Sequence, residues 1–117
     1  MIVLKKAYRI KKNSEFQDIF KTGKSFANRE LVIYYKKKQD QEHFRIGISV
    51  GKKIGNAVTR NRVKRCIREA FIQLEPSIKH NVDIIIIARN PVNHMDSEDM
   101  KRSLTHLLRK QRLFLNK

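Results

Sequence analysis

The chain contains very few of the residues that crosslink proteins or bind metals. It is 117 residues long, with one cysteine, Cys66, and no tryptophan. A single cysteine excludes an internal disulfide and makes no zinc site by itself, which fits a reducing cytoplasm. The histidines show no ligand spacing with one another or with Cys66, so we expect the protein to bind no metal. These histidines are His43, His80, His94 and His106.

Long apolar runs are missing as well. The start of the chain reaches Lys5 and Lys6 after too few apolar residues for a secretory signal, and residues 84–88 are far too short to span a membrane. The acidic residues are scattered singly, with no pair spaced as an acid/base dyad or a two-metal nuclease requires. We therefore expect a soluble, unprocessed cytoplasmic chain that shows no catalytic group of its own.

Basic residues, in contrast, are abundant. Lysine and arginine number 27 against 11 aspartates and glutamates, a formal charge of +16, which exceeds what solubility requires and indicates a strongly anionic partner. Hydrophobic residues make up 40% of the chain and recur periodically, so the charge belongs to a folded protein and not to a disordered tail. The length supports one hydrophobic core, and we predict a single domain over residues 1–117.

Hydrophobic periodicity predicts a helix and two or three strands in the first half of the chain. Residues 14–17 match a capping box that would begin a short helix, and Gly23 would end it. Residues 30–36 alternate as a strand, with a shorter strand expected near 25–28. Residues 44–50 also alternate, as a half-buried strand that we expect to be antiparallel to the one before it.

The second half is predicted as helix, strand, helix. The first of these helices, from Val58 to Leu74, is described below. The β-branched run 83–88 is typical of a central strand covered on both faces, and Pro91 would end it. Asp96 or Ser97 would cap a last helix with acidic residues in its first turn and basic residues at its end. The pattern as a whole predicts an α+β fold.

The predicted helix from Val58 to Leu74 has two opposed faces. Its apolar stripe is formed by Val63, Ile67, Ala70, Phe71 and Leu74. Its polar side carries Arg60, Asn61, Lys64, Arg65 and Arg68. One interpretation is an ordinary solvated face, but such faces mix signs to gain pairs one turn apart, whereas this one stacks like charges. The pattern therefore favours a surface that binds phosphates.

The same helix favours nucleic acid over a membrane. Arginine binds phosphate through two parallel hydrogen bonds, and Asn61 can hydrogen-bond a base edge or a ribose. A membrane-surface helix would need exposed apolar bulk opposite the charges, and that face is required for the core. Before the helix, Gly51 and Gly55 flank Lys52 and Lys53 without the spacing of a nucleotide-binding loop. That segment is a flexible turn, a phosphate-attracting helix start, or both.

Three aromatic residues have two interpretations. Phe16 and Phe20 are one helical turn apart, and spacing alone favours plain core residues. Alternatively, with Tyr34, they form a platform on which unpaired bases stack. The residues themselves leave both interpretations open.

The segment from Phe44 to Arg65, FRIGISVGKKIGNAVTRNRVKR, closely resembles the signature of the bacterial ribonuclease P protein family. Within it the triplet Arg60-Asn61-Arg62 is distinctive. The resemblance extends to residues 13–20, 27–29 and 84–91 and to the closing helix, so it covers nearly the whole chain.

The resemblance implies an accessory subunit of a ribonucleoprotein. In the family, a large catalytic RNA with Mg²⁺ hydrolyses the phosphodiester that joins the 5′ leader to precursor tRNA. The implied partners are that catalytic RNA and the leader of precursor tRNA, with the protein monomeric in isolation and with no membrane partner. The implied fold is a two-layer αβββαβα sandwich whose βαβ unit crosses over in the rare left-handed sense.

The resemblance also implies two groups of RNA-binding residues. The residues assigned to a cleft that grips the single-stranded leader are Phe16, Phe20, Tyr34, Ser49, Lys52, Lys53, Arg60, Asn61 and Lys64. The residues assigned to the catalytic RNA are Arg62, Arg65 and Arg68. No residue is assigned to catalysis or to a metal.

Two rival functions share the charge and size of the chain. One is a ribosomal-type RNA-binding protein with purely structural work. The other, from a different class, is a protein-only nuclease, against which the scattered carboxylates argue.

Overall fold

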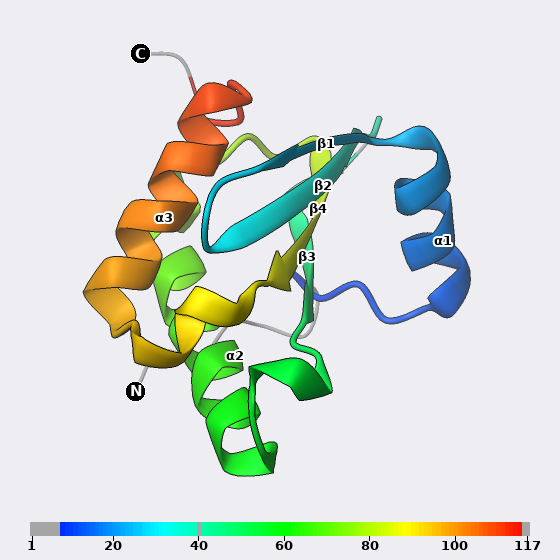
Figure 1. The fold of residues 1–117 in the computed structure, drawn as a ribbon. Coiled ribbons are helices and arrows are strands. Elements are labelled where there is room, and N and C mark those ends of the chain that lie inside the picture. The colour runs from blue at the N-terminus through cyan, green and yellow to red at the C-terminus, as the bar shows by residue number, and fades with distance from the viewer. Residues whose placement is uncertain (1–7, 40, 116–117) are drawn as a thin grey trace.

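The computed structural model describes residues 8–39 and 41–115, so the lysine pair that argues against a secretory signal lies outside the described residues. The helices and strands are α1 (Asn13–Thr22), β1 (Lys24–Ala27), β2 (Leu31–Lys37), β3 (Arg45–Ser49), α2 (Ala57–Leu74), β4 (Val82–Ala88) and α3 (Ser97–Lys110). Short 3-10 helices connect them: η2 (Lys52–Ile54), η3 (Glu75–Ser77) and η4 (Asn90–His94). The predicted α+β fold and its αβββαβα order are confirmed (Figure 1).

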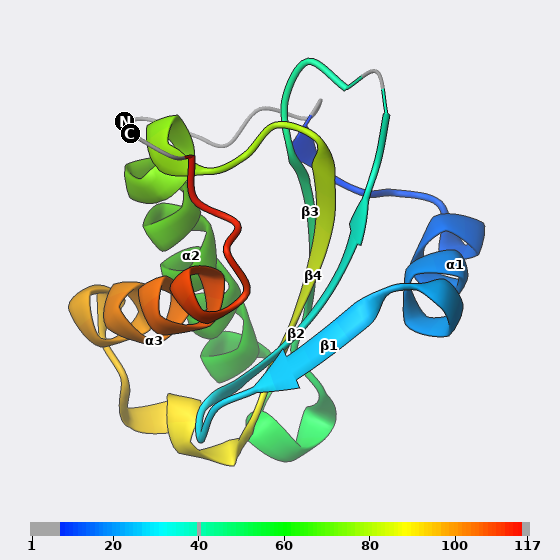
Figure 2. The same cartoon turned by 90° about the horizontal axis from the view of Figure 1, so that it is seen from above.

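The strands form a four-stranded sheet in the order β1-β2-β4-β3. β3 and β4 are parallel, and the other neighbouring strands are antiparallel. β3 runs antiparallel to β2, as expected for 44–50, but the two strands do not pair, because β4 lies between them. Its nearly continuous apolar sequence suits this central place. Figures 1 and 2 together show that the β3-α2-β4 connection is left-handed, as the resemblance implies.

The main core lies between the sheet and the pair α2 and α3. These two helices pack side by side on one face of the sheet (Figure 2). α2 contributes Ile67 and Phe71, and α3 contributes Leu104 and Leu107, all fully buried. Full burial stabilises such side chains by roughly 1.5–3 kcal/mol each. Cys66 is buried at the edge of this core, where a small apolar residue fits.

α1 lies on the opposite face of the sheet (Figure 2). Its buried residue is Ile19, which forms a second, small apolar cluster with Ile10 and Ile85. The main sandwich of sheet and two helices is thus accompanied by a third helix, and α1 presents its side chains to a face that the core does not use.

The helix ends match the predictions unevenly. The capping box predicted at 14–17 is wrong: Lys12 is the N-cap residue of α1, and no side chain caps the helix there. The Glu15 carboxylate instead accepts a hydrogen bond from the Arg45 guanidinium at 2.6 Å. At α3 the prediction is confirmed, because Asp96 forms a capping box.

Candidate nucleic-acid interface

The sheet face under α1 is organised in three rows of residues that run across the strands. Strand register aligns the first row as Lys36, Asp83 and Arg45. The second row is Tyr34, Ile85 and Gly47, and the third is Ala27, Val32, Ile87 and Ser49. The rows differ in their chemistry and in what covers them.

The first row is an ion-pair network that attaches α1 to the sheet. The fully buried Asp83 carboxylate accepts hydrogen bonds from Arg45 Nε at 3.0 Å and Nη2 at 2.6 Å. The same guanidinium donates to Glu15, and Lys36 Nζ donates to Asp18 at 2.7 Å. These hydrogen bonds lower the pKa of Glu15 and the pKa of Asp18. Charge therefore holds α1 in place over this end of the sheet.

The second row lies beneath the aromatic side chains of α1. A Cβ atom on Gly47 would lie 2.5 Å from the Phe16 ring, so only glycine leaves room for that ring on β3. The Phe20 ring is 36% exposed and meets Tyr34 edge-on, with ring centroids 4.9 Å apart. Ile19 is the α1 residue in the core, so the core interpretation of Phe20 is wrong. Phe16 and Tyr34 are half-buried.

The third row is left uncovered. Ala27 and Ser49 are exposed, and Val32 and Ile87 are half-buried, although the alternate residues of β2 and β4 are buried in the core. We call this row, together with the neighbouring ring of Phe20, the open strip. It offers apolar and aromatic surface of the kind on which unpaired bases stack.

Basic residues border the open strip at the end of β3. Lys52 and Lys53 follow Ser49 after two intervening residues, in η2, and both are exposed. α2 then begins at the N-cap residue Asn56, whose side chain accepts a hydrogen bond from the Thr59 backbone at 3.0 Å. The described residues place no acidic side chain in the first turn of α2. Both the lysines and the helix N-terminus favour bound phosphate here.

Arg68 reaches the edge of β3 from α2. A hollow of about 140 Å³ at that edge is lined by Arg9, Phe16, Gly47 and Arg68, among others. Burial, and then the nearby charge of Arg9, lower the pKa of Arg68. An anion between the two guanidinium groups would relieve their repulsion. Arg68 therefore lines the same hollow as Phe16, although the resemblance assigns these two residues to different RNAs.

Arg60 lies about two turns before Arg68 and Lys64 lies about one turn before it, so all three residues share a face of α2. They therefore join Arg68 in a basic stripe on the helix. Arg60 and Lys64 are half-buried, unlike Asn61, which is exposed.

Arg62 and Arg65 differ in their contacts. The Arg62 guanidinium donates to the Asn93 carbonyl at 2.6 Å and to the Met95 carbonyl at 3.2 Å, which fastens α2 to η4. Its assignment to the catalytic RNA thus falls on a side chain that already has a structural role. Arg65 is exposed, as that assignment requires.

Sequence reasoning missed Arg9, Val32 and Ile87. Arg9 precedes the first helix with no motif around it. Val32 and Ile87 belong to apolar runs that read as core, and their exposure depends on strand register and on where α1 ends. The alternation of 30–36 was the one available signal, because it separates Val32 from its buried neighbours Leu31 and Ile33.

Over residues 8–39 and 41–115, no group of three or more histidines, cysteines or carboxylates is placed to hold a metal ion. Within the same residues, no helix is long and apolar enough to cross a membrane.

The chain is similar to known proteins over nearly its whole length. The family model described as Ribonuclease P matches residues 4–112. The ribonuclease P protein component of Oceanobacillus iheyensis is 64% identical over 113 residues, covering 97% of this chain and 93% of that protein. The one of Listeria innocua is 54% identical over 114 residues, covering 97% and 96%.

Solved structures show the same fold. The Staphylococcus aureus RNase P protein superposes with a TM-score of 0.86 at 49% identity, covering 94% of this chain and all of that one. The Thermotoga maritima protein superposes with a TM-score of 0.79 at 32% identity, covering 87% and 96%. The chain therefore belongs to the ribonuclease P protein family, whose members are the protein components of this tRNA-processing enzyme.

Proposed function

We propose that the chain binds both RNAs of ribonuclease P and holds the single-stranded 5′ leader of precursor tRNA along the open strip. The observation that carries this proposal is the uncovered third row beside the exposed Phe20 ring, bordered by Lys52 and Lys53. Stacking on such a surface contributes about 1–3 kcal/mol per base and tolerates any sequence.

The basic stripe of α2 supports a second part of the same role. Arg60, Lys64 and Arg68 form this stripe and bind leader phosphates, and Arg68 shares a hollow with Phe16 at the edge of β3. Arg65 is exposed and binds the catalytic RNA. Asn61, which the resemblance assigns to the leader, is exposed one turn before Arg65, and here it joins Arg65 toward the catalytic RNA. Arg62 acts through structure, because it fixes the position of α2 against η4.

In this role the protein positions RNA and screens charge. The catalytic RNA, with its bound Mg²⁺, supplies the hydrolysis of the phosphodiester. The protein's cations reduce the repulsion between two polyanions and thereby lower the Mg²⁺ concentration that leader removal requires. The ion pairs of the first row hold α1 in place before the leader binds, which reduces the entropy lost on binding.

The test is leader removal by a transcript of the catalytic RNA at low Mg²⁺, with and without the protein. We expect stimulation of cleavage. Binding of RNA without stimulation would indicate the ribosomal-type structural role instead. Cleavage of precursor tRNA by the protein freed of all RNA would indicate a protein-only nuclease.

A matched pair of double variants tests the placement of the leader. Lys52→Ala with Lys53→Ala should weaken holoenzyme binding to precursor tRNA. Arg109→Ala with Lys110→Ala removes the same charge from exposed positions at the end of α3 and should not. Equal losses would show a general charge effect and contradict the placement.

A further inference from the structure

A second and larger hollow lies where the turn between β1 and β2 faces α3 and η4. Its volume is about 570 Å³, within the range of roughly 300–1,000 Å³ that is typical of small-ligand pockets. None of the residues assigned above to the leader or to the catalytic RNA lines it. We call it the turn pocket, and the residues that matter here are Arg29, Glu30, Met95, Arg102, Ser103 and His106.

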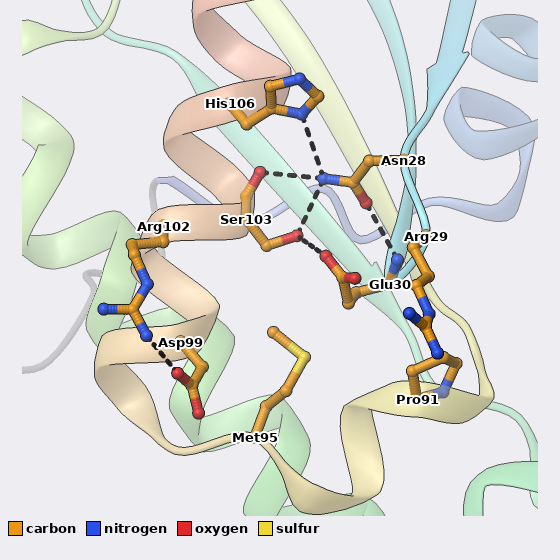
Figure 3. A pocket seen from close by; sticks show the side chains of 9 residues that line it. All are labelled: Asn28, Arg29, Glu30, Pro91, Met95, Asp99, Arg102, Ser103 and His106. Carbon is orange, nitrogen blue, oxygen red and sulfur yellow. Dashed lines mark hydrogen bonds and ion pairs between the residues drawn. The ribbon is translucent and has the colours of Figure 1, made fainter.

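Hydrogen bonds fix the wall of the turn pocket. Asn28 Nδ2 donates to Ser103 Oγ at 2.9 Å, and Asn28 Oδ1 accepts from the backbone N–H of Glu30 at 3.1 Å and of Leu31 at 2.8 Å. Ser103 Oγ in turn donates to Glu30 Oε1 at 3.1 Å. This network ties the turn to α3 and holds the Glu30 carboxylate at the hollow (Figure 3). The pocket is therefore preformed.

The groups inside the turn pocket suit an aromatic ring that carries N–H donors. Figure 3 shows the Met95 side chain between Arg102 on one side and Arg29 on the other. A thioether packs favourably on aromatic rings. Among the described residues, Glu30 Oε2 accepts no hydrogen bond from the protein, so it can accept one from a ligand.

The charges at the mouth of the turn pocket suit a phosphate. Arg29 is exposed, and no carboxylate among the described residues pairs with its guanidinium. Arg102 is also exposed and forms an ion pair with Asp99. Arginine binds phosphate through its fork and stacks on bases through its plane. A nucleotide, and not a neutral ring, satisfies both sets of groups.

We propose that the turn pocket receives one unpaired nucleotide of an RNA partner, with the base on Met95, a base N–H donated to Glu30, and a phosphate at Arg29. Guanine fits best, because its N1–H and 2-amino group donate side by side and a carboxylate can accept both. This proposal rests on the proposed function, because it takes RNA to be the partner. The nucleotide comes from the catalytic RNA or from precursor tRNA, and the experiment separates the two.

The first experiment titrates the protein with guanosine monophosphate and follows backbone amide signals by NMR. We expect saturable shifts at Arg29, Glu30 and His106, with at least threefold weaker binding of inosine monophosphate, which lacks the 2-amino group. Glu30→Gln should weaken the binding of guanosine monophosphate at least threefold, because the glutamine amide places a donor where the ligand needs an acceptor. Equal shifts with inorganic phosphate, or no effect of Glu30→Gln, would overturn the proposal.

The Glu30→Gln variant is designed to stay folded. The glutamine carbonyl still accepts from Ser103, so thermal unfolding should be unchanged. Lys37→Ala is the control, because it removes an exposed charge at the far end of β2 from Glu30.

The second experiment measures binding to each RNA separately. Glu30→Gln and Arg29→Ala should raise Kd at least threefold either for the catalytic RNA alone or for precursor tRNA binding to the holoenzyme, and whichever RNA responds supplies the nucleotide. If Glu30→Gln and Arg29→Ala change Kd for both RNAs no more than Lys37→Ala does, the proposed nucleotide site in the turn pocket is overturned. If the wild-type protein still stimulates leader removal at low Mg²⁺, the proposed function survives that result.

Discussion

The two faces of the sheet are stabilised in different ways. On the face under α2 and α3, side chains such as Ile33 and Ile86 are fully buried in one apolar core. On the face under α1, the cover consists of an ion-pair network at one end and a small cluster around Ile85 in the middle, and the third row is open. Because side chains alternate along a strand, the same four strands serve both faces. With the leader placed on the open strip as proposed, folding stability and RNA binding are assigned to opposite sides of one sheet.

The largest expected effect is on the core face. Phe71→Ala should lower the free energy of unfolding by about 3–5 kcal/mol, because it leaves a cavity where a fully buried ring lies. Denaturant unfolding measures the loss. The fraction that remains folded should bind precursor tRNA as the wild type does, and a selective loss of leader affinity would contradict the division between faces.

Asp83→Ala should lower both folding stability and leader affinity, although the residue lies on the face under α1. It leaves the Arg45 guanidinium without its main partner, and we expect a loss on the order of 2–3 kcal/mol, below the roughly 3–5 of a fully buried pair because the Arg45 side chain is 25% exposed. Because α1 is attached through this network, leader affinity should fall as well. Intact leader binding in a destabilised variant would show that the network serves stability alone.

Phe20→Ala should affect only the open face. The ring is partly exposed, so unfolding should change little, whereas binding of long-leader substrates should lose about 1–3 kcal/mol if a base stacks on it. A precursor tRNA without a leader is the control substrate. Lost thermal stability with unchanged leader affinity would assign the ring to the fold.

Arg65 and Arg62, three residues apart on α2, should also differ, one in its effect on RNA binding and the other in its effect on stability. Arg65→Ala should lower the slope of log affinity against log salt by roughly 0.7–0.9 for a lost phosphate contact. Arg62→Ala should mainly lower thermal stability, because it frees the carbonyls of Asn93 and Met95. An unchanged salt slope for Arg65→Ala would remove that residue from the RNA surface.

The smallest effect should appear in acid. The pKa of Glu15 is lowered by its hydrogen bond with Arg45, so its stabilising effect is complete above the ordinary glutamate pKa of about 4.3 and is lost as pH falls through the lowered value. We expect the docking of α1, followed by NMR signals of Phe20, to weaken below that pH. Glu15→Gln should remove this part of the pH dependence, and an identical profile would contradict the role of the pair.

Local patterns predicted the elements well but not their pairing. The alternation in 44–50 and the run in 83–88 each identified a strand. Burial on one face gives alternating apolar residues, and burial on both faces gives a continuous apolar run. Nothing local records that β4 lies between β2 and β3, since that depends on contacts far apart in sequence. The capping box at 14–17 failed because α1 begins earlier, at Asn13 after the N-cap residue Lys12, so Ser14 lies inside the first turn and not at the N-cap.

The binding surface was predicted unevenly for the same reason. The sequence motifs and the family resemblance pointed to Phe20 and Lys52. Val32 and Ile87 were identified only from the strand register, which aligns them in the open strip. Arg62 shows that a basic residue inside a binding motif can also serve the scaffold, and its assignment to the catalytic RNA stays a prediction.

The central place of β4 also determines when this protein can become functional during synthesis. β2 can pair with β1 as soon as both are made, but its other edge and the whole of β3 have no strand partner until Val82–Ala88 has left the ribosome. Until then the nascent chain carries the charges of α2 without the surface that orders them. Selective recognition of RNA therefore begins late in translation, in one step with completion of the sheet.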